Sequence, residues 1–381
     1  MEMMNDATSP RRPHGRDDPL MQPLTVGGLT LPNRVVMAPL TRSRAGQPGD
    51  VPTEMNAQYY AQRAGAGLIV SEGTVVSDVA RGFAWTPGIY TSEQVSGWRL
   101  VTDSVHDAGG RIFCQLWHCG RVSHESLHPG KPTVAPSSMP ATGAMAFIVG
   151  DDGKGVRQPA SQPQALTNEG IAATIADFRA AARNAAEAGF DGVEIHAANG
   201  YLLHQFLASN ANVRTDDFGG PVANRVRLLK MVTQAVLEVW PSSRVGVRVS
   251  PLFTGNGMRD AIPEETFVAV AEMLSGRGLA YLHVADSGVM LPGGEPHMED
   301  ILEFMRGRFD GPMMLCGGYD GPRARAALEA HDADLVAFGR HYISNPDLAE
   351  RLSAGAALNP PDPRTFYGGG RAGYTDYPTL N

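Results

Sequence analysis

The stretch DGVEIHAANGYLLHQFL, residues 191–207, runs from an apolar strand pattern straight into His196, Asn199 and Tyr201. His196 and Asn199 are hydrogen-bonding side chains three positions apart, and the phenol of Tyr201 follows two positions later. Taken alone, His196 is more simply a structural histidine, but the close spacing favours a shared role. Together the three side chains are able to hold one substrate oxygen and to protonate a neighbouring carbon. The stretch therefore indicates redox or acid-base chemistry at the end of a strand.

Outward from this strand, short runs rich in Val, Ile and Leu alternate with longer segments of helical period. The predicted strands are residues 34–38, 67–71, 111–116, 192–195, 244–249, 280–284, 312–316 and 334–338. Helical patterns fall between them, for example over 53–64, 168–188, 223–239 and 263–275, with Thr167 as a predicted N-cap. Eight strand–helix units predict an α/β protein with a single (β/α)₈ TIM barrel.

Three further segments belong to this expected architecture. Residues 23–32, PLTVGGLTLP, read as a hairpin with a Gly-Gly turn that plugs the barrel floor. Residues 119–166 form a long excursion after the third strand, and AFIVGDDGKGVRQ within it reads as a second hairpin. Residues 1–19 are expected to be a disordered N-terminal tail, which leaves 20–381 as the barrel domain.

Composition narrows the class of partner. The chain has 381 residues, 43% of them hydrophobic, and a formal net charge of -8 without a dense basic block. We therefore expect a small-molecule partner and neither nucleic acid nor a membrane. Cys114, Cys119 and Cys316 match no disulfide framework and no zinc or iron–sulfur spacing, which favours a cytoplasmic protein without a metal. Whether it is a monomer or a homodimer stays open.

Active sites of TIM barrels lie at the carboxyl ends of the strands, and unusual residues collect there in this sequence. They are Pro39, Leu40 and Thr41 after strand one, Gly73 after strand two, Gln115 and Trp117 at strand three, Arg248 at strand five, Gly317 and Gly318 after strand seven, and Gly339 and Arg340 after strand eight.

Each of these residues also has a structural interpretation. The glycines could serve turns alone, but backbone amides beside Arg340 suit a phosphate. Arg248 could be a buried ion-pair partner or a cation facing an electron-rich cofactor edge. Gln115 offers a heterocycle both a donor and an acceptor, whereas Trp117 could be packing or the wall of a pocket.

Seven ordered motifs carry a resemblance to a known family. They are VVMAPLTRSRA from residue 35, SEGT from 71, QLWHCGR from 115, HAANGYLLHQFLASNANVRTDDFGG from 196, VGVRVSP from 245, VAFGRHYISNPDL from 336 and FYGGGRAGYTDYP from 366. In these motifs, from about residue 21 to the C-terminus, the chain resembles the old yellow enzyme family. It is most similar to the bacterial branch containing N-ethylmaleimide reductase and pentaerythritol tetranitrate reductase.

The resemblance implies non-covalent FMN, reduced by NADPH or NADH and reoxidised by an activated alkene such as an α,β-unsaturated carbonyl or a maleimide. The residues that it implies for FMN are Pro39, Leu40, Thr41, Gly73, Gln115 and Arg248, with Gly317, Gly318, Gly339 and Arg340 for the phosphate. His196 and Asn199 would bind the substrate carbonyl, and Tyr201 would protonate the α-carbon. Trp117, Phe83 and Tyr367 would line the substrate side of the pocket.

Departures from the family pattern bear on substrate choice. Phe83 stands where close relatives commonly have Tyr, and the loop 285–298 lacks an aromatic residue that those relatives place over the pocket. Cys119 adjoins the third strand, but nothing around it in the sequence marks a lowered pKa, so we take it as structural.

Four alternatives remain open from the sequence. A nitrate ester or nitroaromatic reductase would use the same scaffold, and a non-catalytic flavin protein would bind the cofactor without turnover. A non-redox, phosphate-binding lyase of the Schiff-base type needs a lysine at a strand end, and Lys131, Lys154 and Lys230 lie elsewhere. A metal-dependent hydrolase would have to use the loose cluster of His118, His124 and His128.

Overall fold

Eight parallel strands close into a barrel in the computed structural model, which describes residues 17–286 and 298–380. Each strand pairs with the next in chain order, and the last pairs with the first. The barrel strands are β3 (Val35–Met37), β4 (Leu68–Val70), β6 (Ile112–Trp117), β11 (Gly192–Ala197), β12 (Val245–Val249), β13 (Tyr281–Ala285), β14 (Met313–Cys316) and β15 (Leu335–Phe338). All eight predicted strands and the TIM barrel are confirmed.

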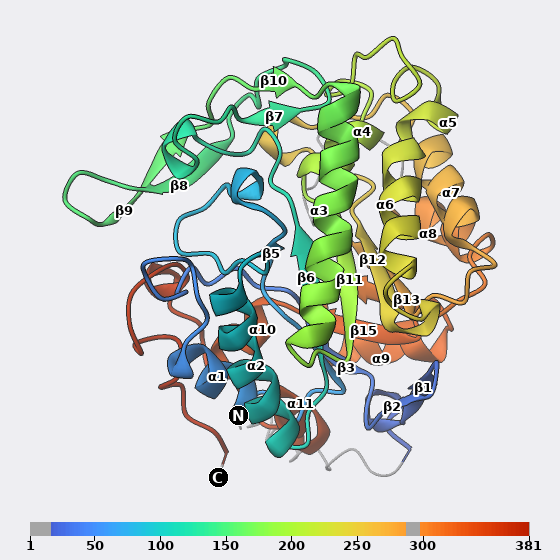
Figure 1. The fold of residues 1–381 in the computed structure, drawn as a ribbon. Coiled ribbons are helices and arrows are strands. Elements are labelled where there is room, and N and C mark those ends of the chain that lie inside the picture. The colour runs from blue at the N-terminus through green and yellow to red at the C-terminus, as the bar shows by residue number, and fades with distance from the viewer. Residues whose placement is uncertain (1–16, 287–297, 381) are drawn as a thin grey trace, which may run out of the picture.

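Helices surround the barrel, as Figure 1 shows for α3 and α6 beside the central strands. The α-helices are α1 (Glu54–Ala61), α2 (Ser92–Asp107), α3 (Asn168–Glu187), α4 (Leu202–Leu207), α5 (Val222–Arg225), α6 (Arg227–Leu237), α7 (Pro263–Leu274), α8 (Met298–Arg306), α9 (Gly321–Glu329), α10 (Arg340–Ser344) and α11 (Leu348–Ala354). The predicted cap is confirmed, because the Thr167 side chain accepts a hydrogen bond from the Gly170 backbone N–H. The helix predicted over 223–239 is divided into α5 and α6 at Val226.

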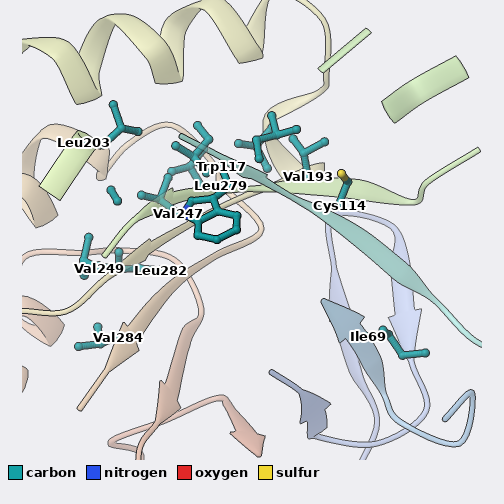
Figure 2. Close-up of a cluster of buried hydrophobic side chains, with 14 of the residues drawn as sticks. Ile69, Cys114, Trp117, Val193, Leu203, Val247, Val249, Leu279, Leu282 and Val284 are labelled. Carbon is teal, nitrogen blue, oxygen red and sulfur yellow. The ribbon is translucent and has the colours of Figure 1, made fainter. Parts of the chain in front are cut away.

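The main apolar core lies between the strands and the helices. Outward-facing side chains such as Val193, Val247 and Leu282 come from three neighbouring strands and gather with Leu203 in one buried cluster (Figure 2). Burial on this face explains the continuous apolar runs of the strands, since both faces of a barrel sheet are covered.

The barrel floor is closed by the predicted hairpin. Strands β1 (Leu24–Val26) and β2 (Leu29–Leu31) pair antiparallel, and Val26, Leu29 and Leu31 join the apolar cluster inside the barrel. Above them the Phe113 and Tyr281 rings stack with centroids 5.9 Å apart. The plug prediction is therefore confirmed.

The excursion after β6 forms the opposite end of the molecule. It contains β7 (Val134–Ala135), β8 (Met145–Val149), β9 (Gly155–Pro159) and β10 (Gln164–Ala165), and a short β5 (Thr74–Val75) pairs with β6. Strands β8 and β9 form the predicted antiparallel hairpin, which projects from the end of the barrel away from β1 and β2 (Figure 1).

The first described residues, from 17 on, precede the predicted start of the domain at residue 20. Asp18 is buried, caps the short 3₁₀-helix Pro19–Met21, and forms an ion pair with Arg325 at 2.8 Å. Ordered structure thus includes residues placed in the predicted tail, because a carboxylate beside an arginine docks the segment on α9. Residues 1–16 and most of the loop 285–298 lie outside the described residues. Within the described ranges no helix is long and apolar enough to cross a membrane.

Candidate active site

Tyr201 lies at the centre of an aromatic cluster above the carboxyl end of β11. Its ring centroid is 4.9 Å from that of Trp117, 5.2 Å from that of His196 and 6.3 Å from that of Phe83. Strand β11 carries His196, and Tyr201 immediately precedes α4. The structure thus brings together four of the residues that the sequence singled out.

Asn199 is fixed in the turn between this strand and α4. Its φ of 56° lies in the left-handed region, which Asn tolerates better than most residues. Its backbone N–H donates to Ser250 Oγ at 2.7 Å, and its carbonyl accepts from Asn256 Nδ2 at 3.1 Å. The side-chain amide has no hydrogen-bond partner among the described residues, so it remains available to a ligand.

Burial sets the protonation states of His196 and Tyr201. His196 is 4% exposed, and burial, followed by the positive charge of Arg248, holds its pKa well below the usual value. Burial raises the pKa of Tyr201 above its usual value, with smaller contributions from Cys119 and Tyr367. At neutral pH the site therefore offers a neutral imidazole and a protonated phenol.

A cavity of about 410 Å³ opens beside this cluster. Six residues predicted for the site line it, namely Pro39, Leu40, Thr41, Phe83, Tyr201 and Tyr367. The sequence reasoning missed the other lining residues, Arg42, Gly143, Met145, Phe147, Arg157, Asn256, Ile343 and Phe366. Several of these residues belong to the hairpin β8–β9. The sequence predicts this hairpin, but it does not indicate which of its two faces borders a cavity.

Arg42 holds the C-terminal segment against this cavity. Its guanidinium is buried and donates to the carbonyl oxygens of Phe366 at 3.0 Å and Gly373 at 2.8 Å, and to Tyr59 Oη at 3.1 Å. These contacts position Phe366 and the adjacent Tyr367 in the cavity wall. The only feature of the sequence that could have pointed to Arg42 is its position directly after Thr41.

Gly73 packs against the indole of Trp117. A Cβ atom on Gly73 would lie 2.5 Å from Cε3 of Trp117, so the missing side chain makes room for the indole. The close approach that requires glycine is therefore with Trp117. The indole Nε1 is buried and has no hydrogen-bond partner among the described residues.

A polar layer lies inside the barrel below the aromatic cluster. Gln115 Nε2 donates to Glu194 Oε1 at 2.8 Å, and His283 Nδ1 lies 2.8 Å from Glu194 Oε2. Arg248 Nη2 lies 3.9 Å from the Sγ of Cys316, and no carboxylate among the described residues forms an ion pair with Arg248. The ion-pair alternative for Arg248 therefore does not hold for the described part of the chain. Glu194, His283 and Cys316 were not predicted as part of the site.

Several buried nitrogen atoms in this region lack partners among the described residues. They are Nε1 of Trp117, Nδ1 of His196, Nε of Arg248 and Nε2 of His283. Buried polar atoms are rarely left unpaired, because the lost hydration costs roughly 1–3 kcal/mol each. They come from the neighbouring strands β6, β11, β12 and β13, which indicates that a polar ligand completes their hydrogen bonds.

The four residues predicted for a phosphate directly follow the adjoining strands β14 and β15. Gly317 has φ 130°, and a Cβ there would lie 1.9 Å from the Asp286 carbonyl oxygen. Gly318 also has a positive φ, and Gly339 immediately precedes Arg340. The Arg340 side chain makes no hydrogen bond or ion pair with any residue in the described ranges. Arg323, which donates to the Gly317 carbonyl at 3.1 Å, is a second cation here that the sequence did not reveal.

The remaining cysteine and histidine candidates have local structural contacts. Cys119 is buried, and burial raises the pKa of its thiol well above the usual value, as its structural assignment requires. His118 Nδ1 accepts from the Gly120 N–H at 3.0 Å, His128 contacts Ser123, and His124 contacts Ser126. Across residues 17–286 and 298–380 no group of three or more potential ligands could hold a metal ion.

The fold and the site define a class: a TIM-barrel enzyme whose barrel mouth is arranged for a polar cofactor beside an aromatic substrate cavity. Comparison with known proteins is more specific. Residues 19–359 match the NADH:flavin oxidoreductase / NADH oxidase family, an FMN family. The chain belongs to this family, and it is an oxidoreductase with FMN as cofactor.

The similarity to known proteins extends over nearly the whole chain. A probable flavin mononucleotide-dependent alkene reductase of Leishmania infantum is 42% identical, with 95% of this chain and 98% of that protein covered. Morphinone reductase is 49% identical with a TM-score of 0.91 and 98% of both chains covered, and its complex with tetrahydroNAD is 50% identical with a TM-score of 0.90, covering 95% and 98%. The old yellow enzyme homologue from Zymomonas mobilis is 42% identical with a TM-score of 0.89, covering 95% and 99%. The predicted family is confirmed, which sets aside the lyase and hydrolase alternatives.

The residues present fit FMN. Trp117, His196, Arg248 and His283 each carry a buried nitrogen atom without a hydrogen-bond partner among the described residues, and a ring system with several acceptor atoms satisfies such groups. The unpaired Arg340 lies beside backbone with the positive φ angles of Gly317 and Gly318, where a phosphate is commonly held in this fold.

Proposed function

We propose that this protein is an FMN-dependent ene reductase that reduces activated alkenes, in particular α,β-unsaturated carbonyl compounds and maleimides, at the expense of NADPH or NADH. The observation that carries the proposal is the cluster of Tyr201 and His196 at the cavity bordered by Pro39, Leu40 and Thr41. It joins a protonated phenol and a neutral hydrogen-bond donor at the expected cofactor face. The alkene reductase of Leishmania infantum and the tetrahydroNAD complex of morphinone reductase support the same reaction class.

The proposed cofactor contacts divide into a ring site and a phosphate site. The ring would be held by Pro39, Leu40, Thr41, Gln115 and Arg248, with Gly73 acting through the position of Trp117. The phosphate would be held by Arg340 with the backbone of Gly317, Gly318 and Gly339. When bound, FMN supplies the carrier that takes a hydride from the nicotinamide and delivers it to the β-carbon of the alkene.

His196 and Asn199 would bind the substrate carbonyl oxygen. A neutral His196 donates one N–H, and the unpaired amide of Asn199 supplies a second donor. Two donors stabilise the negative charge that develops on the oxygen as the β-carbon is reduced. Because His196 carries no charge, it polarises the carbonyl without acting as a strong acid.

Tyr201 would protonate the α-carbon. Its raised pKa keeps the phenol protonated at neutral pH, and its hydroxyl has no hydrogen-bond partner among the described residues. The rings of Phe83 and Trp117 pack against that of Tyr201, and Tyr367 lines the same cavity, so apolar surface borders the site of protonation.

An anaerobic titration tests the function. The purified protein should carry a flavin spectrum, which should bleach with NADPH or NADH and return when cyclohexenone is added. A flavin that bleaches with either nicotinamide and is not reoxidised by enones, maleimides or nitro compounds would contradict the ene-reductase proposal. Reoxidation by nitro compounds or nitrate esters alone would favour the alternative reductase on this scaffold.

A further inference from the structure

Glu194 is a buried carboxylate that no step of the proposed reaction uses. It lies on β11 two residues before His196, so both side chains face the barrel interior, and its side chain is completely buried. The register places Glu194 opposite Gln115 of β6, whereas His283 on β13 lies opposite Arg248 of β12. Four neighbouring strands thus contribute to one polar layer.

The hydrogen bonds of Glu194 determine how Gln115 is oriented. An ionised carboxylate only accepts hydrogen bonds, so the amide NH₂ of Gln115 must face Glu194 Oε1, and their separation is 2.8 Å. The Gln115 carbonyl oxygen is consequently turned away from Glu194, and it has no partner among the described residues. In the same way Nδ1 of His283 must carry a proton toward Glu194 Oε2.

Electrostatics keep this carboxylate ionised. Burial opposes its charge, but the attraction of His283 and then of Arg248 outweighs burial and holds the pKa of Glu194 below its usual value. Burial also works against a charged His283, but the charge of Glu194 outweighs it and raises the pKa of the imidazole. The acceptor-only form of Glu194 is therefore the relevant one at neutral pH.

We propose that Glu194 is a positioning residue for cofactor recognition: it fixes the Gln115 amide with its carbonyl oxygen toward the barrel mouth, so that this strand end accepts a hydrogen bond from a ring imide N–H. The inference rests on the proposed function, because the isoalloxazine ring of FMN is the ring that presents such an N–H. A Gln115 amide in the opposite orientation would present two donors to that N–H, which is a repulsive contact.

The test is Glu194→Gln. Gln115 and His283 contact different oxygens of Glu194, and only one of these two positions is an oxygen in Gln, so the Gln115 amide loses its fixed orientation. We expect FMN to bind the apoprotein about tenfold more weakly, as one misplaced hydrogen bond commonly costs. The vibrational bands of the flavin carbonyl groups should also shift, because they respond to hydrogen bonding at the imide. Asp260→Asn is the matched control, since Asp260 is another buried carboxylate, paired with Arg225 at 3.0 Å, and it should leave both readouts unchanged.

The swapped chain Gln115→Glu with Glu194→Gln tests whether an acceptor oxygen at position 115 is what the cofactor requires. It keeps a donor–acceptor pair between β6 and β11 and leaves the second carboxylate oxygen at position 115 free to accept from the ring imide N–H, so the thermal stability of the apoprotein and FMN affinity should both return toward those of the parent. If Glu194→Gln does not fold, the swapped chain carries the test. FMN affinity that stays low in a swapped chain of parental stability, or unchanged affinity and carbonyl bands in Glu194→Gln, would overturn the proposal. A parent protein that binds no FMN would instead refute the proposed function.

Discussion

Burial acts in opposite senses on the two residues at the centre of the site, His196 and Tyr201. Removal from water disfavours the imidazolium of His196 and the phenolate of Tyr201, so the first pKa is lowered and the second is raised. Both side chains are thereby uncharged at neutral pH. In the proposed reaction, His196 therefore donates a hydrogen bond to the carbonyl oxygen, and Tyr201 delivers the proton.

Replacing the phenol separates the two half-reactions. Tyr201→Phe should slow alkene reduction by about a hundredfold or more, because general acid catalysis commonly contributes that much. Reduction of the flavin by nicotinamide needs no carbon protonation and should change little. Stopped-flow measurement of each half-reaction checks this, with Tyr342→Phe as a control because Tyr342 is buried and its hydroxyl is also unpaired. Equal slowing of both half-reactions would contradict the role of Tyr201.

Removing the carbonyl donors should weaken ligand binding without releasing the cofactor. The double variant His196→Ala with Asn199→Ala removes both proposed carbonyl donors, and each lost hydrogen bond costs about 1 kcal/mol. We therefore expect phenols and enones to bind at least tenfold more weakly, while the FMN content stays that of the parent. Spectral titration with a phenol measures both quantities. Undiminished phenol affinity would show that the oxygen is bound elsewhere.

At the scale of elements, the sequence predicts what is periodic and misses what is brought together by folding. The barrel strands and the N-cap at Thr167 follow from local patterns, and the motifs locate Tyr201 and His196. By contrast, Arg42 contacts the Phe366 carbonyl across 324 positions, and Glu194 joins Gln115 across 79. Neither partner carries a local signal of the other, so these contacts became visible only in the fold.

The hairpin β1–β2 should contribute to stability and not to catalysis. Leu31 is buried in the apolar cluster inside the barrel floor, at the end opposite the site. Leu31→Ala removes this packing and should lower the free energy of unfolding by about 2–5 kcal/mol. Denaturant titration gives this value, and the flavin spectrum with both half-reaction rates should remain those of the parent. Thr30→Ala, on the exposed face of the same strand, should leave stability nearly unchanged.

At the scale of the whole molecule, buried histidines couple stability to pH. Burial, and then the neighbouring His128, lowers the pKa of His118 to about 3, while burial lowers that of His204 to about 4. Glu72 has the opposite effect on the pH dependence of stability, because burial raises its pKa to about 7 and the folded chain therefore binds its proton more tightly than the unfolded chain. The unfolded chain binds protons on its histidines near pH 6.5, and the folded chain does not bind them at His118 and His204 until much lower pH. Stability due to these two residues is therefore present above about pH 6.5 and is lost as the pH falls.

A single substitution isolates this effect. His118→Asn keeps an acceptor for the Gly120 N–H but cannot titrate, so the variant should lose less stability than the parent between pH 6.5 and 5. The linkage relation gives a difference in slope that approaches about 1.4 kcal/mol per pH unit below pH 6.5, or about 1.6 kcal/mol over this interval. Denaturant unfolding at several pH values measures it, with His331→Asn as a control because His331 is exposed. Parallel pH profiles for the parent and His118→Asn would mean that His118 binds its proton equally well in the folded and unfolded chains, contrary to its burial.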